Sequence, residues 1–235
     1  MITKKTVKSP SIKIAEMSKL LENIYRSINI ALINELKIAT TKLDIDIYDV
    51  IKIASTKPFG FQKFFPGPGT GGHCIPIDPI YFSWLSKKKG VNVKFIELSS
   101  KINQIRTKWI IKKLKTIAKK ISSPKILLLG LSYKKNIEDT RESASIKILE
   151  DLLKQKYAID YSDPFNQKIV LNYRKKRKVL FSKKFSKNVV KKYNLIIIAT
   201  DHDKFDYSLL KSSNKTIVDL RGKFKNIKSR YIYQL

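Results

Sequence analysis

The amino-acid sequence predicts an α/β protein in which a helical domain with one long spine helix precedes a doubly wound parallel sheet. Apolar residues recur at steps of three and four through residues 12–43, the period of a helix with one buried stripe. Further along, short apolar runs alternate with stretches of helical period, as in folds with a parallel sheet. We place the boundary at Ser122-Ser123-Pro124, between a helical domain (1–121) and an α/β domain (122–235).

The first domain is predicted to contain four helices. A spine helix of about 30 residues would be some 45 Å long, which suits a bridge between two lobes or a dimer interface. Further helices are predicted at 46–55, 81–88 and 96–120. The intervening segment 57–79 holds five of the chain's eight glycines, so it is predicted to be a loop that a ligand approaches closely.

In the second domain, five apolar runs are predicted to be strands: 125–129, 158–161, 178–181, 195–199 and 216–219. A helix is predicted at 141–156. Ligands of a doubly wound sheet bind at the carboxyl ends of its strands. Here those ends carry residues 130–135, 162–163 and 200–203.

The chain carries 49 Lys and Arg residues against 19 Asp and Glu residues, a formal net charge of +30. Such a charge is typical of proteins that bind nucleic acids or membrane surfaces. The basic residues are nevertheless spread over the whole chain, and neither an RNA-binding aromatic motif nor zinc-finger spacing is present. We therefore favour a soluble fold with a lysine-rich surface, whose field would also attract a nucleotide diphosphate.

The chain has one cysteine and two histidines. One cysteine excludes an internal disulfide, and this set cannot by itself form a tetrahedral metal site. The N-terminus lacks the apolar stretch of a signal peptide, and no apolar run approaches the ~18 residues that span a bilayer. We expect a cytoplasmic protein without a membrane segment.

The loop that leads to Cys74 has the composition of a catalytic loop. A thiol after a glycine-rich segment is surrounded by backbone N–H groups, which stabilise a thiolate and a developing oxyanion. Asp78 follows four residues later, so a helix beginning there would place it one turn away, as a base or a group that orients water. His73 is a poor partner for Cys74, because adjacent side chains point apart. The alternative is a loop that only buries a free cysteine.

Several segments match one enzyme family in order. The segment Gly69–Pro79 reads GTGGHCIPIDP, residues 15–35 form a helix that contains KLLEN, and residues 129–143 combine LGLSYKK with DTRES. The turn at 161–164 agrees with them. Together these segments resemble the UDP-glucose/GDP-mannose dehydrogenase family. The His-Cys-Ile-Pro form is similar to bacterial UDP-N-acetylglucosamine and related UDP-sugar 6-dehydrogenases.

The resemblance implies NAD-dependent oxidation of the C6 alcohol of a UDP-sugar to a carboxylate, for surface polysaccharide biosynthesis. Cys74 takes the position of the nucleophile that attacks the aldehyde-level intermediate, passing through a thiohemiacetal and a thioester. Lys19 and Asn23 match the family's catalytic lysine and asparagine, and their spacing of four puts both on one helical face. Asp78 matches the family's carboxylate after the cysteine.

The resemblance also implies ligand contacts. The sugar nucleotide would be bound by loop residues and by residues of the second domain: Phe65, Gly67, Gly69, Gly71, Tyr133, Lys134 and Arg221. Arg141 matches an arginine that contacts NAD across the domain interface. A homodimer through the long helix is expected.

The family begins with an NAD-binding Rossmann domain that carries G-x-G-x-x-G, and no such motif occurs in this sequence. We expect a partial dehydrogenase whose cofactor domain is supplied by a separate chain or has been lost. Two alternatives stay open. One is an inactive fragment that binds nucleotide sugars or dimerises, and the other is a basic nucleic-acid-binding protein.

Overall fold

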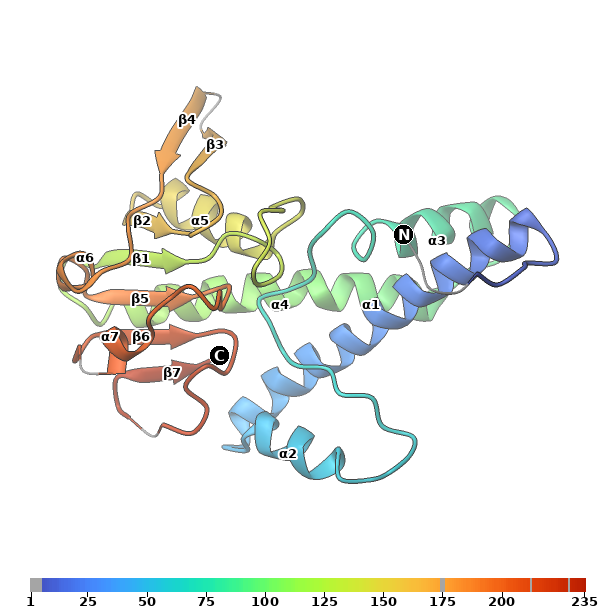
Figure 1. Ribbon diagram of the computed structural model, residues 1–235, viewed down its shortest axis with the longest axis horizontal. Coiled ribbons are helices and arrows are strands. Elements are labelled where there is room, and N and C mark those ends of the chain that lie inside the picture. The colour runs from blue at the N-terminus through green and yellow to red at the C-terminus, as the bar shows by residue number, and fades with distance from the viewer. Residues whose placement is uncertain (1–5, 174–175, 212, 228) are drawn as a thin grey trace.

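The computed structural model describes residues 6–173, 176–211, 213–227 and 229–235. A helical region precedes a parallel sheet, and one long helix runs through both, as Figure 1 shows. This arrangement confirms the predicted fold class.

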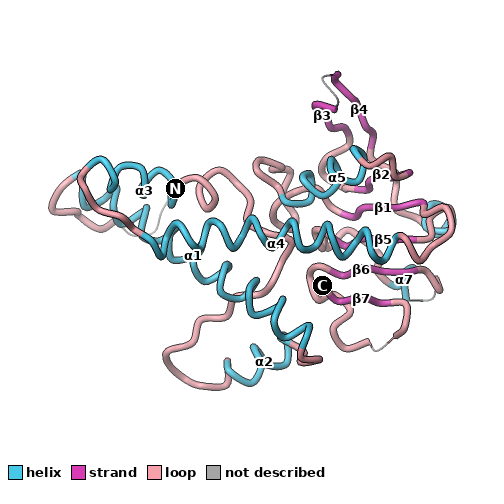
Figure 2. Tube along the Cα trace, turned by 180° about the vertical axis from the view of Figure 1, so that it is seen from behind, coloured by secondary structure: helices cyan, strands magenta, loops and turns pink. Residues whose placement is uncertain are grey.

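The helical region contains α1 (Ile12–Lys42), α2 (Ile47–Ala54), α3 (Asp78–Lys88) and α4 (Lys94–Ala118). The helix α1 begins after Ser11, whose hydroxyl accepts a hydrogen bond from the Ile14 amide over 3.3 Å. No Gly or Pro interrupts its 31 residues. The helices α1 and α4 pack against each other, α3 packs on both, and α2 folds back on α1 (Figure 2).

The second region is built on a five-stranded sheet in which all neighbouring strands are parallel. The strand order is β2-β1-β5-β6-β7. The strands are β1 (Lys125–Leu129), β2 (Ala158–Ser162), β5 (Leu195–Ile198), β6 (Thr216–Asp219) and β7 (Ile232–Gln234). The chain leaves β1 on one side for β2 and returns on the other side for β5. The carboxyl ends of β1 and β5 therefore flank a topological switch point, where ligands of such sheets bind.

Both faces of the sheet are covered. Three shorter helices flank it: α5 (Ala144–Lys154), α6 (Lys187–Lys191) and α7 (Ser208–Lys211). Leu128 packs in a core with side chains of α4 and α5, whereas its neighbour Leu129 packs in a core with side chains of α6 and α7. Ile110 and Leu114 of α4 belong to the first core. The helix α4 is therefore the element that joins the helical region to the sheet.

The strands β3 (Lys168–Tyr173) and β4 (Lys176–Phe181) form a separate antiparallel pair that projects beside the sheet (Figure 1). The strand predicted at 178–181 belongs to this hairpin and not to the parallel sheet. Ile169 and Leu171 anchor the hairpin in the core that α5 covers. No strand is predicted at β3 or β7, because the apolar run of β3 is only three residues long (169–171) and β7 itself has only three residues.

Candidate functional site

The loop between α2 and α3 is held by side chains of the two long helices. Asn34 Oδ1 on α1 accepts a hydrogen bond from the Gly67 N–H over 3.0 Å. On α4, Arg106 Nε donates to the Gly67 carbonyl over 3.0 Å, and Thr107 Oγ1 donates to the Pro68 carbonyl over 2.8 Å. A loop rich in Gly and Pro lacks helix or strand partners for its backbone, so these side chains satisfy it.

Asn34 itself belongs to a buried network between the helices. Its Nδ2 donates to Asn103 Oδ1 over 3.1 Å, and Asn103 Nδ2 donates to the Ser27 carbonyl over 3.2 Å. All three residues are buried. A buried amide is costly to leave unpaired. The network therefore favours one crossing of α1 over α4, and so one position of the loop.

The second half of the loop packs on the segment after β1. Gly72 has a φ of +89°, and a Cβ there would lie 2.9 Å from Tyr133 Cζ. Gly71 packs against Cβ of the same tyrosine. The Gly72 N–H donates to the Arg141 carbonyl over 2.8 Å. Only glycine combines this backbone angle with this close approach.

Cys74 is an exposed free cysteine at the end of the loop. Its carbonyl accepts hydrogen bonds from the N–H groups of Ile77 and Asp78 over 3.1 and 2.8 Å. The helix α3 begins at Asp78, so Asp78 lies one turn after the cysteine, as its spacing suggested. The Asp78 carboxylate is reached from α1 by Asn23, whose Nδ2 donates to Asp78 Oδ2 over 2.6 Å. The structure thus makes neighbours of Asn23, Asp78 and Cys74.

Lys19 lies one helical turn before Asn23, with its ammonium 3.3 Å from the Glu22 carboxylate. Arg26 also binds Glu22, over 3.0 Å, and donates from Nη1 to Asn23 Oδ1 over 2.9 Å. The hydrogen bonds from Lys19 and Arg26 lower the pKa of Glu22. The Lys19 side chain is 62% exposed, so its ammonium is accessible to a ligand.

Arg221 provides another contact between the second region and the loop. Its Nε donates to the Ala199 carbonyl over 2.9 Å, and its Nη2 donates to the Tyr133 carbonyl over 3.1 Å. A Cβ on Gly67 would lie 3.0 Å from Arg221 Nη1, so the guanidinium lies directly against the loop. The structure therefore brings Gly67, Tyr133 and Arg221 together.

The remaining residues predicted to bind the sugar nucleotide lie around this contact. The half-exposed Phe65 stacks on Tyr48 with ring centroids 6.4 Å apart. Gly69 has a φ of +150°, and a Cβ there would lie 2.6 Å from Thr107 Oγ1. The Lys134 side chain is exposed. Close packing of the loop on α4 thus requires glycine at position 69.

Arg141 forms a bidentate pair with Asp139, in which Nε lies 3.0 Å from Oδ1 and Nη2 lies 2.6 Å from Oδ2. The pair holds the pKa of Asp139 below its ordinary value and raises the pKa of Arg141. The turn after β1 contains a single glycine, Gly130, rather than a dinucleotide-binding motif. The turn after β1 is therefore not a dinucleotide-binding turn.

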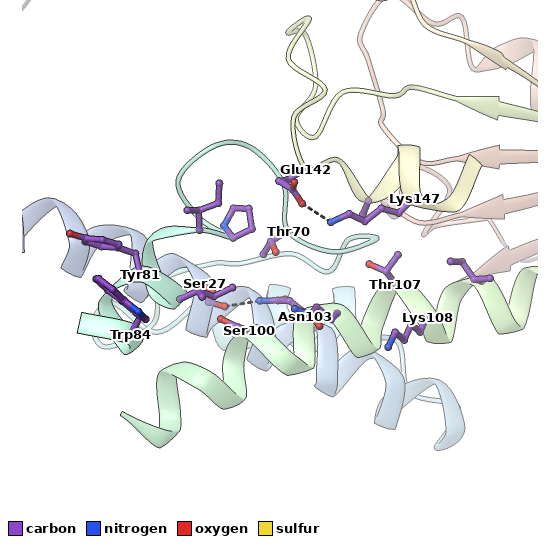
Figure 3. Close-up of a pocket in the computed structure, with 16 residues that line it drawn as sticks. Ser27, Thr70, Tyr81, Trp84, Ser100, Asn103, Thr107, Lys108, Glu142 and Lys147 are labelled. Carbon is purple, nitrogen blue, oxygen red and sulfur yellow. Dashed lines mark hydrogen bonds and ion pairs between the residues drawn. The ribbon is translucent and has the colours of Figure 1, made fainter. Parts of the chain in front are cut away.

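A groove of about 930 Å³ lies beside the loop, between α1, α3, α4 and α5 (Figure 3). Its walls are mainly apolar. Tyr81 and Trp84 stack at one end with ring centroids 5.9 Å apart, and Glu142 pairs with Lys147 over 2.8 Å at the other. Cys74 does not line it. The groove therefore adjoins the candidate site without containing the thiol.

A buried Asp–His pair orders the strand ends of the second region. His202 Nε2 lies 3.2 Å from Asp163 Oδ2, and His202 Nδ1 accepts from the Asn136 N–H over 2.9 Å. Because Nδ1 accepts, the ring proton is on Nε2, which donates to the carboxylate.

Within the described ranges, no group of three His, Cys, Asp or Glu side chains could hold a metal ion, and no helix is long and apolar enough to cross a membrane.

Sequence reasoning missed the helix side chains that hold the loop, Asn34, Arg106 and Thr107. The signal that could have found them is a polar residue within the buried stripe of a helix. Arg106 and Thr107 lie on the same side of α4 as the buried Ile110 and Leu114. A charged or amide side chain at such a position must have a polar partner, and a loop rich in Gly and Pro is a natural one.

Comparisons with known proteins assign both regions to one family. The family model described as the UDP-glucose/GDP-mannose dehydrogenase family, central domain, matches residues 13–105. The model for that family's UDP binding domain matches residues 127–226.

Individual relatives give the same picture. The chain is 32% identical over 230 residues to UDP-N-acetyl-D-mannosamine dehydrogenase of Methanocaldococcus jannaschii, covering 94% of this chain and 49% of that protein. It is 36% identical over 168 residues to UDP-N-acetyl-D-glucosamine 6-dehydrogenase of Pseudomonas aeruginosa, covering 70% and 39%. The structure of UDP-N-acetyl-mannosamine dehydrogenase from Staphylococcus aureus aligns with a TM-score of 0.72 at 31% identity, covering 95% and 51%. The chain thus spans about half the length of these relatives.

Proposed function

The chain belongs to the UDP-glucose/GDP-mannose dehydrogenase family, and on that premise we propose that it binds a UDP-N-acetylhexosamine and supplies the thiol for NAD-dependent oxidation of its C6 alcohol. One observation carries the proposal. An exposed cysteine ends a glycine-rich loop that is held by the helical region on one side and by Arg221 of the UDP-binding region on the other. A sugar nucleotide lying along this loop would reach both regions.

Cys74 is proposed to act on the aldehyde level of the substrate. Its thiolate attacks C6, a C–S bond forms, and the carbonyl π pair moves to oxygen, where the Lys19 ammonium would stabilise the negative charge. Oxidation of this adduct gives a thioester. Attack by water then breaks the C–S bond and releases the carboxylate and the thiol. Both oxidations need a hydride acceptor, which NAD would supply if it were bound, and Arg141 is the residue of this chain that we propose would contact it.

Asp78 and Asn23 are proposed to act in the hydrolysis of the thioester. A carboxylate one helical turn from the cysteine is placed to accept a proton from the attacking water. Asn23 orients that carboxylate through its 2.6 Å hydrogen bond, and Arg26 in turn orients the Asn23 amide. Each group is held by the next, which is the arrangement that keeps a base in one position.

The N-acetylhexosamine assignment rests on the relatives. The M. jannaschii and S. aureus proteins are UDP-N-acetylmannosamine dehydrogenases, whereas the P. aeruginosa protein is a UDP-N-acetylglucosamine 6-dehydrogenase. These substrates differ only in configuration at C2. We propose the mannosamine form as the first substrate to test, because those relatives cover more of the chain.

We further propose that the chain forms a homodimer through α1. Exposed apolar side chains recur along α1: Ile14, Met17, Leu21, Tyr25, Leu32 and Leu36. At about 100° per residue these positions fall on one stripe. A continuous apolar stripe on a surface helix marks a contact surface. Light scattering at micromolar concentration should give twice the chain mass, and Leu21→Lys should give the single mass.

The first experiment is calorimetric titration with UDP-N-acetylmannosamine, UDP-N-acetylglucosamine and UDP, without NAD. We expect binding of the sugar nucleotides and protection of Cys74 from iodoacetamide by the bound ligand. Cys74→Ala should bind them equally well, because the thiol acts after binding. If the chain bound duplex DNA with a steep salt dependence and did not bind UDP-sugars, the proposal would be wrong and a nucleic-acid-binding function would take its place.

A further inference from the structure

Arg106 is the most deeply buried charged side chain near the candidate site. Its exposed fraction is 0%. Its Nε donates to the Gly67 carbonyl over 3.0 Å, while Nη1 and Nη2 have no hydrogen-bond partner among the described residues. Its guanidinium carbon lies 5.0 Å from the centre of the Trp109 ring, which offers a cation–π contact.

The burial of Arg106 is not explained by a contribution to folding stability. Removing a guanidinium from water is costly unless a carboxylate or several hydrogen bonds replace the lost hydration. Arg106 forms no ion pair within the described ranges, and burial lowers its pKa to about 10, with the nearby Tyr48 hydroxyl acting in the opposite direction. A neutral side chain of similar volume would fill this position at lower cost. The feature left to explain is the bond to Gly67.

Gly67 is a loop residue that contacts both the helical region and the UDP-binding region. Its N–H is bound by Asn34 of α1 and its carbonyl by Arg106 of α4. Its Cα lies against the Arg221 guanidinium, which is itself fixed by the carbonyls of Ala199 and Tyr133. A shift of the Gly67 peptide would therefore change the spacing between the loop backbone and Arg221.

We propose that Arg106 is a positioning residue for the sugar-nucleotide loop: it holds the Gly67 carbonyl so that the loop and Arg221 present their contacts at one spacing. The inference rests on the proposed function, because it assumes that this loop binds the substrate. Arg106 acts through Gly67 and does not touch the ligand. Arg106 contributes to the affinity for the sugar nucleotide, whereas its burial lowers the stability of the fold.

Two substitutions separate these roles. In Arg106→Gln the side-chain amide nitrogen occupies the same place along the side chain as Nε, so the donor to Gly67 is kept and the charge is removed. In Arg106→Met both are removed. Lys112→Met, an exposed position on the same helix, controls for the loss of one positive charge.

We expect Arg106→Met to bind UDP-N-acetylmannosamine at least tenfold more weakly, with Tm changed by no more than about 3 °C, since loss of the hydrogen bond and relief of the buried charge oppose each other. Arg106→Gln and Lys112→Met should bind within about threefold of the parent chain. Unchanged affinity in Arg106→Met would overturn the proposal. So would a large fall in Tm alongside the loss of affinity, because that is the signature of a structural residue. Loss of affinity in Arg106→Gln equal to that in Arg106→Met would assign the effect to the charge and also overturn it.

A second measurement keeps this inference apart from the proposed function. Hydrogen exchange of the amides at Gly67, Gly69 and Thr70 reports on the loop without any ligand. Faster exchange in Arg106→Met, restored in Arg106→Gln, supports positioning even if the parent chain binds no UDP-sugar, in which case only the proposed function fails. Equal exchange in both variants and the parent would refute positioning directly.

Discussion

The Asn23 side-chain amide donates a hydrogen bond to Asp78 Oδ2 over 2.6 Å, joining α1 to the first residue of α3 across 55 positions of the sequence. Asp78 also donates its own N–H to the Cys74 carbonyl over 2.8 Å. The position of the thiol-bearing turn is therefore coupled to the long helix through one amide–carboxylate contact.

Replacing this amide by a carboxylate tests the contact. Asn23→Asp places two carboxylates together at neutral pH, and we expect the free energy of unfolding to fall by about 2 kcal/mol. The two carboxylates would then bind one proton between them with a raised folded-state pKa. Stability should therefore return as pH falls through that value, so the deficit in Tm should be smaller at pH 5 than at pH 7.5. The double variant Asn23→Asp with Asp78→Asn reverses donor and acceptor and should recover most of the loss. Additive effects would show that the two groups do not interact.

Gly72→Ala and Gly60→Ala form a matched pair of loop substitutions. Both glycines have positive φ, +89° and +77°, but only Gly72 would place a Cβ against the Tyr133 ring, since nothing lies within 4 Å at Gly60. Gly60→Ala should destabilise the chain by about 1 kcal/mol through backbone strain alone. Gly72→Ala should cost at least twice as much in chemical denaturation and should weaken binding of UDP-sugars. Equal losses of stability in the two variants would mean that the Tyr133 ring moves aside at little cost.

Arg221→Lys keeps the positive charge but removes the planar group that reaches the Ala199 and Tyr133 carbonyls together. We expect a loss of about 2 kcal/mol in unfolding free energy and at least tenfold weaker binding of UDP-sugars in calorimetry. The control is Arg230→Lys, because Arg230 is exposed and donates to the neighbouring Tyr231 hydroxyl. Unchanged affinity in Arg221→Lys would remove Arg221 from the substrate contacts.

The buried Asp163 gives the chain an acid-sensitive contribution to stability. Burial opposes ionisation of this carboxylate, but the hydrogen bonds from His202 and from the N–H groups of Leu131, Phe165 and Asn166 together lower its pKa from 3.8. A carboxyl group whose pKa is lower in the folded state than in the unfolded state stabilises the fold at pH values above its unfolded-state pKa. This stabilisation is lost as the pH falls through the folded-state pKa. Asp163→Asn should therefore be less stable by about 3 kcal/mol at pH 7. The difference from the parent chain should shrink below pH 3.8 in urea titrations. A difference that stays constant into strong acid would contradict this assignment.

Much of the fold could be predicted because its signals are local. The apolar stripe predicts α1, and the Gly- and Pro-rich segment predicts the loop before Cys74. Alternation of short apolar runs with helical stretches predicts the parallel sheet. The spacing between Cys74 and Asp78 likewise suggested that Asp78 lies one turn after the cysteine, since four residues make about one helical turn. The hairpin of β3 and β4 was not separable from the main sheet, because a single short apolar run does not reveal its partner.

The sequence by itself determined the long helices, most strands of the parallel sheet, the glycine-rich loop before Cys74 and the family. Periodicity, glycine and proline content, and motif spacing are properties of neighbouring residues. Only the tertiary structure decided what holds that loop. Asn34, Arg106 and Arg221 reach Gly67 from positions far away along the chain, and α4 rather than the longer first helix joins the helices to the sheet. Bonds between a side chain and a distant backbone group leave no periodic trace, because they depend on how the helices cross rather than on the order of the residues.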